Sequence, residues 1–156
     1  MIKLSFKGED SKKVEHFNKK VTVVTLKPVI VGLNFFDISL DSKALDFIHS
    51  HPNIEMTGTK MGLALKVQGK ATCNEEDEFD PVWGERIAEA RAKIRLYKFM
   101  TTLLYKLMRY HSNMAYGKDS TTLRTVQGKT GFFAYARKFE ELVRSERKHL
   151  NKLLDS

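Results

Sequence analysis

The sequence predicts an α+β fold in one domain over residues 1–156, with a small N-terminal antiparallel β-sheet followed by two C-terminal helices, the first one long. Two patterns and a boundary support this prediction. Residues 1–80 contain short alternating or β-branched runs typical of strands, whereas residues 81–156 repeat apolar side chains at helical spacing. Asp80-Pro81, a strong helix start, separates the two parts.

The first 80 residues contain four candidate strands, each a short run of alternating apolar or β-branched residues. They are Ile2–Phe6, Val21–Val31 with an interruption at Pro28, Phe36–Leu40 and Met61–Cys73. The last one places Leu63, Leu65 and Val67 on one face, which predicts a half-buried strand. A short helix is expected to begin at Asp41 or Ser42 and to end near Pro52.

The second part predicts two helices. The first begins after the N-cap Asp80 and can continue to about Asn113, because no proline follows Pro81 and no glycine occurs between Gly84 and Gly117. Its apolar residues cover far more than one stripe, so we expect burial by the sheet and also by a second subunit or helix. Residues 113–129 are expected to form a loop, and a final helix follows residue 130.

The charge lies mostly in the second part of the chain. Residues 1–80 contain 11 Lys, no Arg and 12 acidic residues, whereas residues 81–156 contain 16 basic and 7 acidic residues. Arginine offers a planar fork that suits phosphate groups, so we expect an anionic partner to bind the second part. No apolar run is long enough to span a membrane, no signal peptide is evident and one cysteine fits a reducing compartment, so we expect a cytoplasmic protein.

Five acidic residues, Glu75, Glu76, Asp77, Glu78 and Asp80, stand directly before the long helix. Only Asp80 is close enough to cap the helix and to interact with its dipole. The other four are expected to form a solvated turn. A divalent cation or a basic partner would be the alternatives.

One face of the long helix carries basic residues without any acid. The residues are spaced by three or four positions: Arg91, Arg95, Lys98, Thr102, Lys106 and Arg109. A solvated face would explain basic residues, but this face repels itself, so we expect an anion there. A ligand, a nucleic acid or an acidic patch of another subunit could supply that anion. A second basic line, Arg137, Arg144 and Lys148, follows on the last helix and is diluted by Glu141.

Several more specific chemistries find no support. Gly128-Lys129-Thr130 resembles the end of a phosphate-binding P-loop, but Leu123 replaces the first glycine. His49 and His51 have no further ligand spaced for a metal. Cys73 is expected to be a packed thiol. We therefore expect a protein that is not an enzyme and that uses neither a metal nor a cofactor.

Residues 69–92, GKATCNEEDEFDPVWGERIAEARA, resemble a segment shared by small bacteriophage proteins, with Asp77-Glu78-Phe79-Asp80 and Gly84 at its centre. The sheet followed by a long helix and a second helix is similar to the first-described family of phage anti-Thoeris proteins. That resemblance implies an oligomeric sponge, active in the cytoplasm of an infected bacterium. Such a sponge binds a cyclic ADP-ribose isomer (glycocyclic ADP-ribose, for example) or a cyclic oligonucleotide, both immune signals, and does not cleave them.

A ligand of this kind needs arginine forks for phosphates and aromatic faces for bases. The candidate ligand-binding residues are Arg91, Arg95, Lys98, Arg109, Arg137 and Arg144, with Phe79 and Tyr97 for stacking. We expect a homo-oligomer, a dimer or larger, with the long helix in its interface. The alternatives are a small phage nucleic-acid-binding protein with weak, salt-sensitive affinity, and a protein-only inhibitor of a host defence complex.

Overall fold

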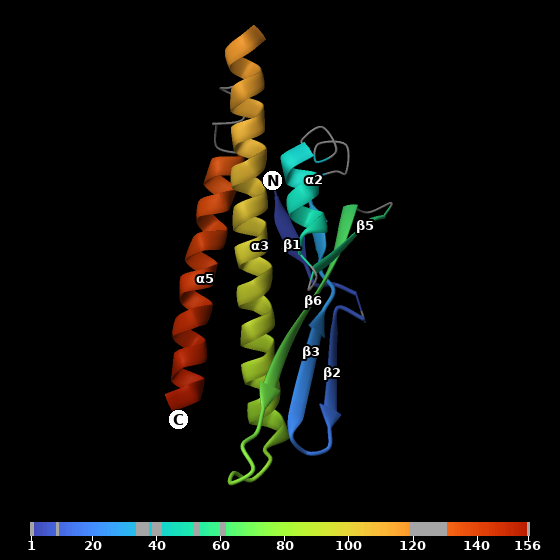
Figure 1. The fold of residues 1–156 in the computed structure, drawn as a ribbon, viewed down its shortest axis with the longest axis vertical. Coiled ribbons are helices and arrows are strands. Elements are labelled where there is room, and N and C mark those ends of the chain that lie inside the picture. The colour runs from blue at the N-terminus through green and yellow to red at the C-terminus, as the bar shows by residue number, and fades with distance from the viewer. Residues whose placement is uncertain are drawn as a thin grey trace.

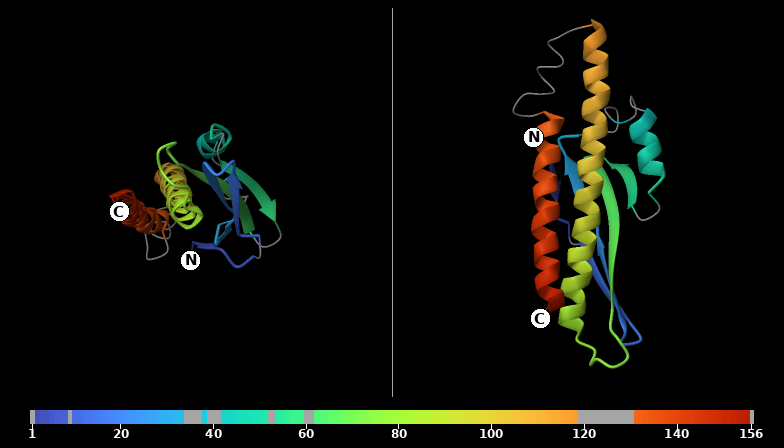
Figure 2. Two further views of the ribbon diagram at one scale, coloured as in Figure 1. Left: turned by 90° about the horizontal axis from the view of Figure 1, so that it is seen from below. Right: turned by 60° about the vertical axis from the view of Figure 1, so that its left-hand side comes forward.

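The structure, a computed structural model, describes residues 2–8, 10–33, 38, 42–51, 54–59, 62–118 and 131–155. The described residues form an antiparallel sheet, a short helix α2 (Ser42–His49), a long helix α3 (Pro81–Lys118) and a final helix α5 (Phe132–Asp155). Helix α3 lies between the sheet and α5 (Figures 1 and 2). The predicted α+β arrangement is confirmed, including the long first helix of the second part.

The sheet is built around its longest strand. The strands are β1 (Lys3–Ser5), β2 (Lys12–Phe17), β3 (Val21–Leu26), β4 (Val29–Val31), β5 (Ile54–Thr59) and β6 (Gly62–Thr72). β6 pairs with β3 and β4 along one edge and with β5 along the other, while β2 and β1 lie outside β3 and β4. Pro28 separates β3 from β4, yet its carbonyl still accepts a hydrogen bond from Leu65 N–H at 2.9 Å.

The strands expected at 2–6, 21–31 and 61–73 are confirmed. β2 and β5 were not predicted. β2 reads KKVEHF, which has too few apolar residues to show alternation, and β5 includes a glycine that lowers its strand propensity. The strand expected at 36–40 falls outside the described residues, apart from Ile38, which is buried.

Asp80 starts α3 as predicted. Its Oδ1 accepts hydrogen bonds from Val82 N–H at 3.0 Å and Trp83 N–H at 3.2 Å. These two N–H groups have no partner within the helix, so the aspartate satisfies them. The helix continues to Lys118, beyond the expected end near Asn113, so the first residues of the expected loop are helical. Its 38 residues span about 57 Å at ~1.5 Å per residue.

The apolar residues of α3 are buried within this one chain. Leu96, Phe99, Met100, Leu103, Leu104 and Leu107 are all at most 1% exposed. The sheet covers one side of the helix, and α5 covers another with Tyr135, Ala136, Phe139 and Val143. The wide apolar surface therefore needs no second subunit, and the observation that favoured an α3 interface between subunits is explained by α5. The expected homo-oligomer stays a prediction.

Backbone contact fixes how α3 sits on the sheet. A Cβ atom at Gly69 of β6 would come within 1.9 Å of the Ala88 carbonyl oxygen and 2.5 Å of Ala92 N, both on α3. At Gly84 a Cβ would lie 2.7 Å from Thr22 Oγ1 of β3. Helix and sheet can approach this closely only because small residues stand at each contact.

The end of α5 is held beside the start of α3. The indole N–H of Trp83 donates to the carbonyl of Leu153 at 3.1 Å, so the two helices run antiparallel along their shared length. Within the described ranges, no helix is long and apolar enough to cross a membrane.

Candidate ligand-binding site

One side of α3 carries charges that are compensated by ion pairs with β2 and α5. Lys12 of β2 lies 2.8 Å from Glu85 and 2.9 Å from Glu89. Glu89 in turn lies 3.6 Å from Lys93, which also reaches Glu146 of α5 at 3.9 Å. Partial burial lowers the pKa of Lys12, but the two carboxylates outweigh it and raise the pKa above its ordinary value. These ion pairs join β2, α3 and α5 and leave no excess of positive charge on this side.

Arg91 and Arg95 begin the basic face, and both bind the sheet. Arg91 Nη1 donates to the Lys70 carbonyl at 2.8 Å, and Arg95 Nη1 donates to the Gln68 carbonyl at 2.9 Å. β5 ends its pairing at Val67, so beyond that point the two arginines occupy the free edge of β6. A guanidinium has five N–H donors, so one such bond leaves donors for another acceptor.

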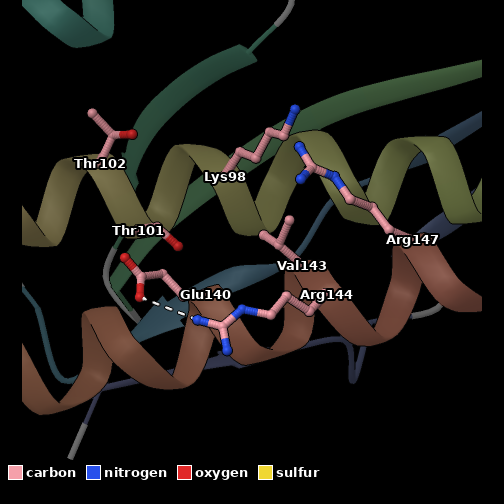
Figure 3. A pocket seen from close by; sticks show the side chains of 7 residues that line it. All are labelled: Lys98, Thr101, Thr102, Glu140, Val143, Arg144 and Arg147. Atoms are coloured by element: carbon pink, nitrogen blue, oxygen red, sulfur yellow. Dashed lines mark ion pairs between the residues drawn. The ribbon is translucent and has the colours of Figure 1, made fainter.

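A groove between α3 and α5 gathers positive charge. It has a volume of about 390 Å³ and is bordered by Lys98, Thr101, Thr102, Glu140, Val143, Arg144 and Arg147. Figure 3 shows the Lys98 amine from α3 and the Arg147 guanidinium from α5 projecting toward the same space. Arg144 lies 3.9 Å from Glu140, whereas Lys98 and Arg147 form no ion pair within the described part of the chain. We call this the cationic pocket.

A second pocket lies on the other side of Lys98, between α3, α2 and β5. It has a volume of about 400 Å³ and is bordered by Phe47, His51, Ile54, Arg95, Lys98, Phe99 and Thr102. The Phe47 and Phe99 rings stack at 5.3 Å, and His51 meets Phe47 edge-on at 4.4 Å. Phe99 and Ile54 are buried, Phe47 and His51 are half-buried, and the Lys106 amine lies 5.5 Å from the centre of the Phe47 ring. We call this the aromatic pocket.

Lys98 and Thr102 border both pockets, so the two form adjoining parts of one surface. Of the candidate residues, the structure brings together Arg95, Lys98 and Arg144 there. It adds Arg147, which lies outside the basic line of Arg137, Arg144 and Lys148 and is therefore not predicted by that spacing. Phe47 and His51 were also missed, because nothing in the sequence shows that α2 packs beside the basic face of α3.

The other candidate residues lie elsewhere. Arg91 borders neither pocket. Arg109 is exposed farther along α3, and the Arg137 guanidinium lies 5.9 Å from the centre of the Phe133 ring. Phe79 packs edge-on against His16 of β2 at 5.7 Å and borders neither pocket.

Tyr97 also serves packing between elements. Its ring lies 6.1 Å from that of Phe139, between α3 and α5. Burial raises the pKa of its hydroxyl, and the nearby carboxylates of Glu146 and Glu89 add to the effect. Tyr97 faces this helix contact and borders neither pocket, so the stacking role expected for it has no support here.

The acidic segment forms a turn around Cys73. The thiol lies 3.5 Å from the carbonyl oxygens of Asn74 and Asp77 and 3.7 Å from that of Glu78. The four acidic side chains from Glu75 to Glu78 are exposed, and Glu75 reaches Lys20 at 3.6 Å. Across the residues that the structure describes, no group of three or more His, Cys, Asp or Glu side chains could hold a metal ion. This is the solvated turn that the sequence predicts.

Residues 69–92 have packing roles that explain their pattern. Gly69, Gly84, Ala88 and Ala92 allow the close contact of α3 with the sheet, and Ile87 is 1% exposed. Asp80 caps the helix, and Arg91 binds the edge of β6. A protein that shares this segment would therefore share the helix–sheet contact, but the segment by itself indicates no ligand.

Comparison with protein families, with curated proteins and with solved structures finds no match to this chain. The function is therefore argued from the two pockets and the charges around them.

Proposed function

We propose that this chain binds a cyclic nucleotide signal across the two adjoining pockets and sequesters it without cleaving it. One observation carries the proposal. Lys98 and Thr102 stand between a pocket with aromatic ring surface and a pocket rich in cations, so a ligand with a base and a phosphate can contact both.

The two pockets supply complementary chemistry. A base can pack against the half-buried Phe47 and His51, which lie beside the buried Phe99; Phe47 stacks on Phe99, and the Lys106 amine over the Phe47 ring adds a further cation next to the base. Phosphate oxygens can accept hydrogen bonds from Lys98, Arg144 and Arg147, and arginine can do so with two parallel bonds. Each pocket lies within the roughly 300–1,000 Å³ usual for small-molecule sites.

One carboxylate borders the proposed site. Glu140 borders the cationic pocket, and it is engaged by Arg144 at 3.9 Å and by the Tyr105 hydroxyl. Burial raises the pKa of Tyr105, and the hydrogen bond to Glu140 adds to the effect. The resemblance of residues 69–92 supports a phage origin, whereas the binding of an immune signal from the host cytoplasm is argued from the two pockets.

Nucleic-acid binding is the second candidate, and the basic stripe along α3 favours it. Against it, Arg91 and Arg95 are turned to the edge of β6, which interrupts the stripe near its start. Each arginine keeps further N–H donors for a phosphate, but its bond to a carbonyl of β6 fixes its position at the sheet edge. We therefore expect DNA and RNA to bind weakly and to lose most of their affinity between low and physiological salt.

Native mass spectrometry of protein purified from cells that make candidate signals tests the proposal, because it reports a retained small molecule directly. Isothermal titration calorimetry should then compare cyclic ADP-ribose isomers, cyclic oligonucleotides and a short single-stranded RNA at two salt concentrations. We expect one cyclic compound to bind at physiological salt and the RNA to bind only at low salt. Tight RNA binding at physiological salt, with no cyclic compound bound, would reverse this order.

A further inference from the structure

The outer edge of β2 is uncovered in the structure. β2 is the last strand of the sheet, and within the described residues it pairs with β3 alone. Helix α3 lies over β3 and β6, and in Figure 1 no drawn element lies beyond β2. An uncovered edge presents unpaired N–H and C=O groups that can bind another strand.

The register of β2 shows which groups face outward. Ser11 O accepts from Lys27 N–H at 2.8 Å, and Phe17 O accepts from Lys20 N–H at 3.0 Å. Backbone direction alternates along a strand, so residues 13, 15 and 17 bond to β3. The N–H and C=O groups of residues 12, 14 and 16 therefore point to the free edge.

Two opposite charges flank the centre of this edge. Lys13 and Glu15 stand on the face away from α3, on either side of Val14, and lie 3.6 Å apart. Lys12 points to the other face, where Glu85 and Glu89 neutralise it. The free edge thus carries one positive and one negative side chain, one on each side of Val14.

We propose that β2 pairs with β2 of a second copy of this chain in antiparallel fashion, with Val14 opposite Val14. In that register Lys13 of each copy lies opposite Glu15 of the other, and opposite charges across strands stabilise a pair. Centring the pair on residue 13 or on residue 15 instead places Lys13 opposite Lys13 or Glu15 opposite Glu15, which is destabilising. Lysine on an edge strand ordinarily prevents pairing, but in this register Lys13 lies opposite Glu15 of the other copy and favours it.

This pairing would make one continuous sheet across two copies, and it does not rest on the proposed ligand site. It places the subunit interface on the outer edge of β2 and not on α3. The two pockets between α3 and its neighbours would stay accessible in both copies.

Sedimentation velocity over a range of protein concentrations tests the pairing. We expect wild type to dimerise and Val14→Pro to stay monomeric with unchanged circular dichroism. The proline removes an outward N–H that has no partner among the described residues, and proline is tolerated on an edge strand in that position. A monomeric wild type at about 100 µM, where a pair of micromolar affinity would be dimeric, would overturn the proposal, as would a Val14→Pro dimer.

Charge exchange then tests the register. Lys13→Glu and Glu15→Lys should each weaken dimerisation about tenfold or more, because each places like charges opposite one another. The double variant Lys13→Glu/Glu15→Lys should restore it, and mixing the two single variants should give a heterodimer. If the double variant dimerises no better than the single ones, the pairing with Val14 at its centre is wrong.

Discussion

Two sides of α3 differ in whether their charged side chains form ion pairs. On one side Glu85, Glu89 and Lys93 form ion pairs with β2 and α5. On the other side Lys98 and its neighbour Arg147 have no ion pair within the described residues, although two pockets open beside them. The first side joins the layers of the fold, whereas the second keeps positive charge exposed next to ring surface.

The difference shows what basic spacing along a helix can and cannot indicate. Arg91 and Arg95 belong to the same stripe as Lys98, yet they bind backbone carbonyls of β6. A charged stripe therefore divides into residues that complete the fold and residues left for a partner. Only the neighbours of each side chain distinguish the two.

Both sides of α3 depend on the position of the helix on the sheet, so a change at that contact should have the largest effect. We expect Gly69→Ala to destabilise the protein by about 2 kcal/mol or more, because the new Cβ would overlap the Ala88 carbonyl and force the helix away. Chemical denaturation measures the change. Gly8→Ala is the matched control, since its Cβ would meet no atom closer than 4.0 Å and should change stability by less than about 0.5 kcal/mol. Equal effects of the two variants would contradict the close contact.

The start of α3 gives the next largest effect. Asp80→Ala should cost about 1 kcal/mol of the free energy of unfolding, because two N–H groups of the first turn lose their acceptor. Asp80→Asn should retain most of the stability, since its side-chain oxygen can still cap. If asparagine behaves like alanine in urea denaturation, the negative charge beside the acidic turn matters more than the hydrogen bonds.

The sequence predicts those parts of the fold and of the site that depend on interactions between neighbouring residues. The Asp80 cap and the half-buried strand β6 follow from local patterns of neighbouring residues, and the sequence predicts both. β2 was not predicted, because KKVEHF becomes a strand by pairing with β3, and the turn at Asn18 and Lys19 uses positive φ without a glycine. The stripe predicted Lys98 correctly as a residue of the basic face. It could not show that Phe47 would come from α2 to stand beside it.

Removal of one charge should change the free energy of unfolding differently on the two sides of α3. Glu89→Ala should destabilise the protein by about 0.5–1 kcal/mol, because Lys12 and Lys93 each lose a partner on a partly exposed surface. Lys98→Ala should be neutral or stabilising by a few tenths of a kcal/mol, because it relieves repulsion within the basic face. Thermal unfolding at low and high salt measures both. A loss on Lys98→Ala as large as that on Glu89→Ala would mean that Lys98 also serves the fold.

The smallest effect is a dependence on alkaline pH. The pKa of Lys12 is raised in the folded protein by its two carboxylates, and the pKa of Tyr97 is raised by burial. Both groups hold their protons more strongly when folded, so their stabilisation is full below their unfolded pKa values and is lost above about pH 10. Urea denaturation at pH 8 and pH 11 should show this loss. Lys12→Met should make the loss smaller, and an unchanged loss would show that Lys12 contributes nothing to it.

A matched pair of variants tests the ligand site most directly. Lys93→Ala and Lys98→Ala each remove one lysine charge from the middle of α3, the first from the compensated side and the second from the wall shared by the two pockets. Isothermal titration calorimetry with cyclic ADP-ribose isomers and a cyclic dinucleotide should be run on wild type and on both variants. We predict that Lys98→Ala weakens binding about tenfold or more, as loss of a charge-assisted hydrogen bond implies, while Lys93→Ala stays within about twofold of wild type. Equal affinity of the two folded variants, or no binding of either compound class by wild type, would contradict the site.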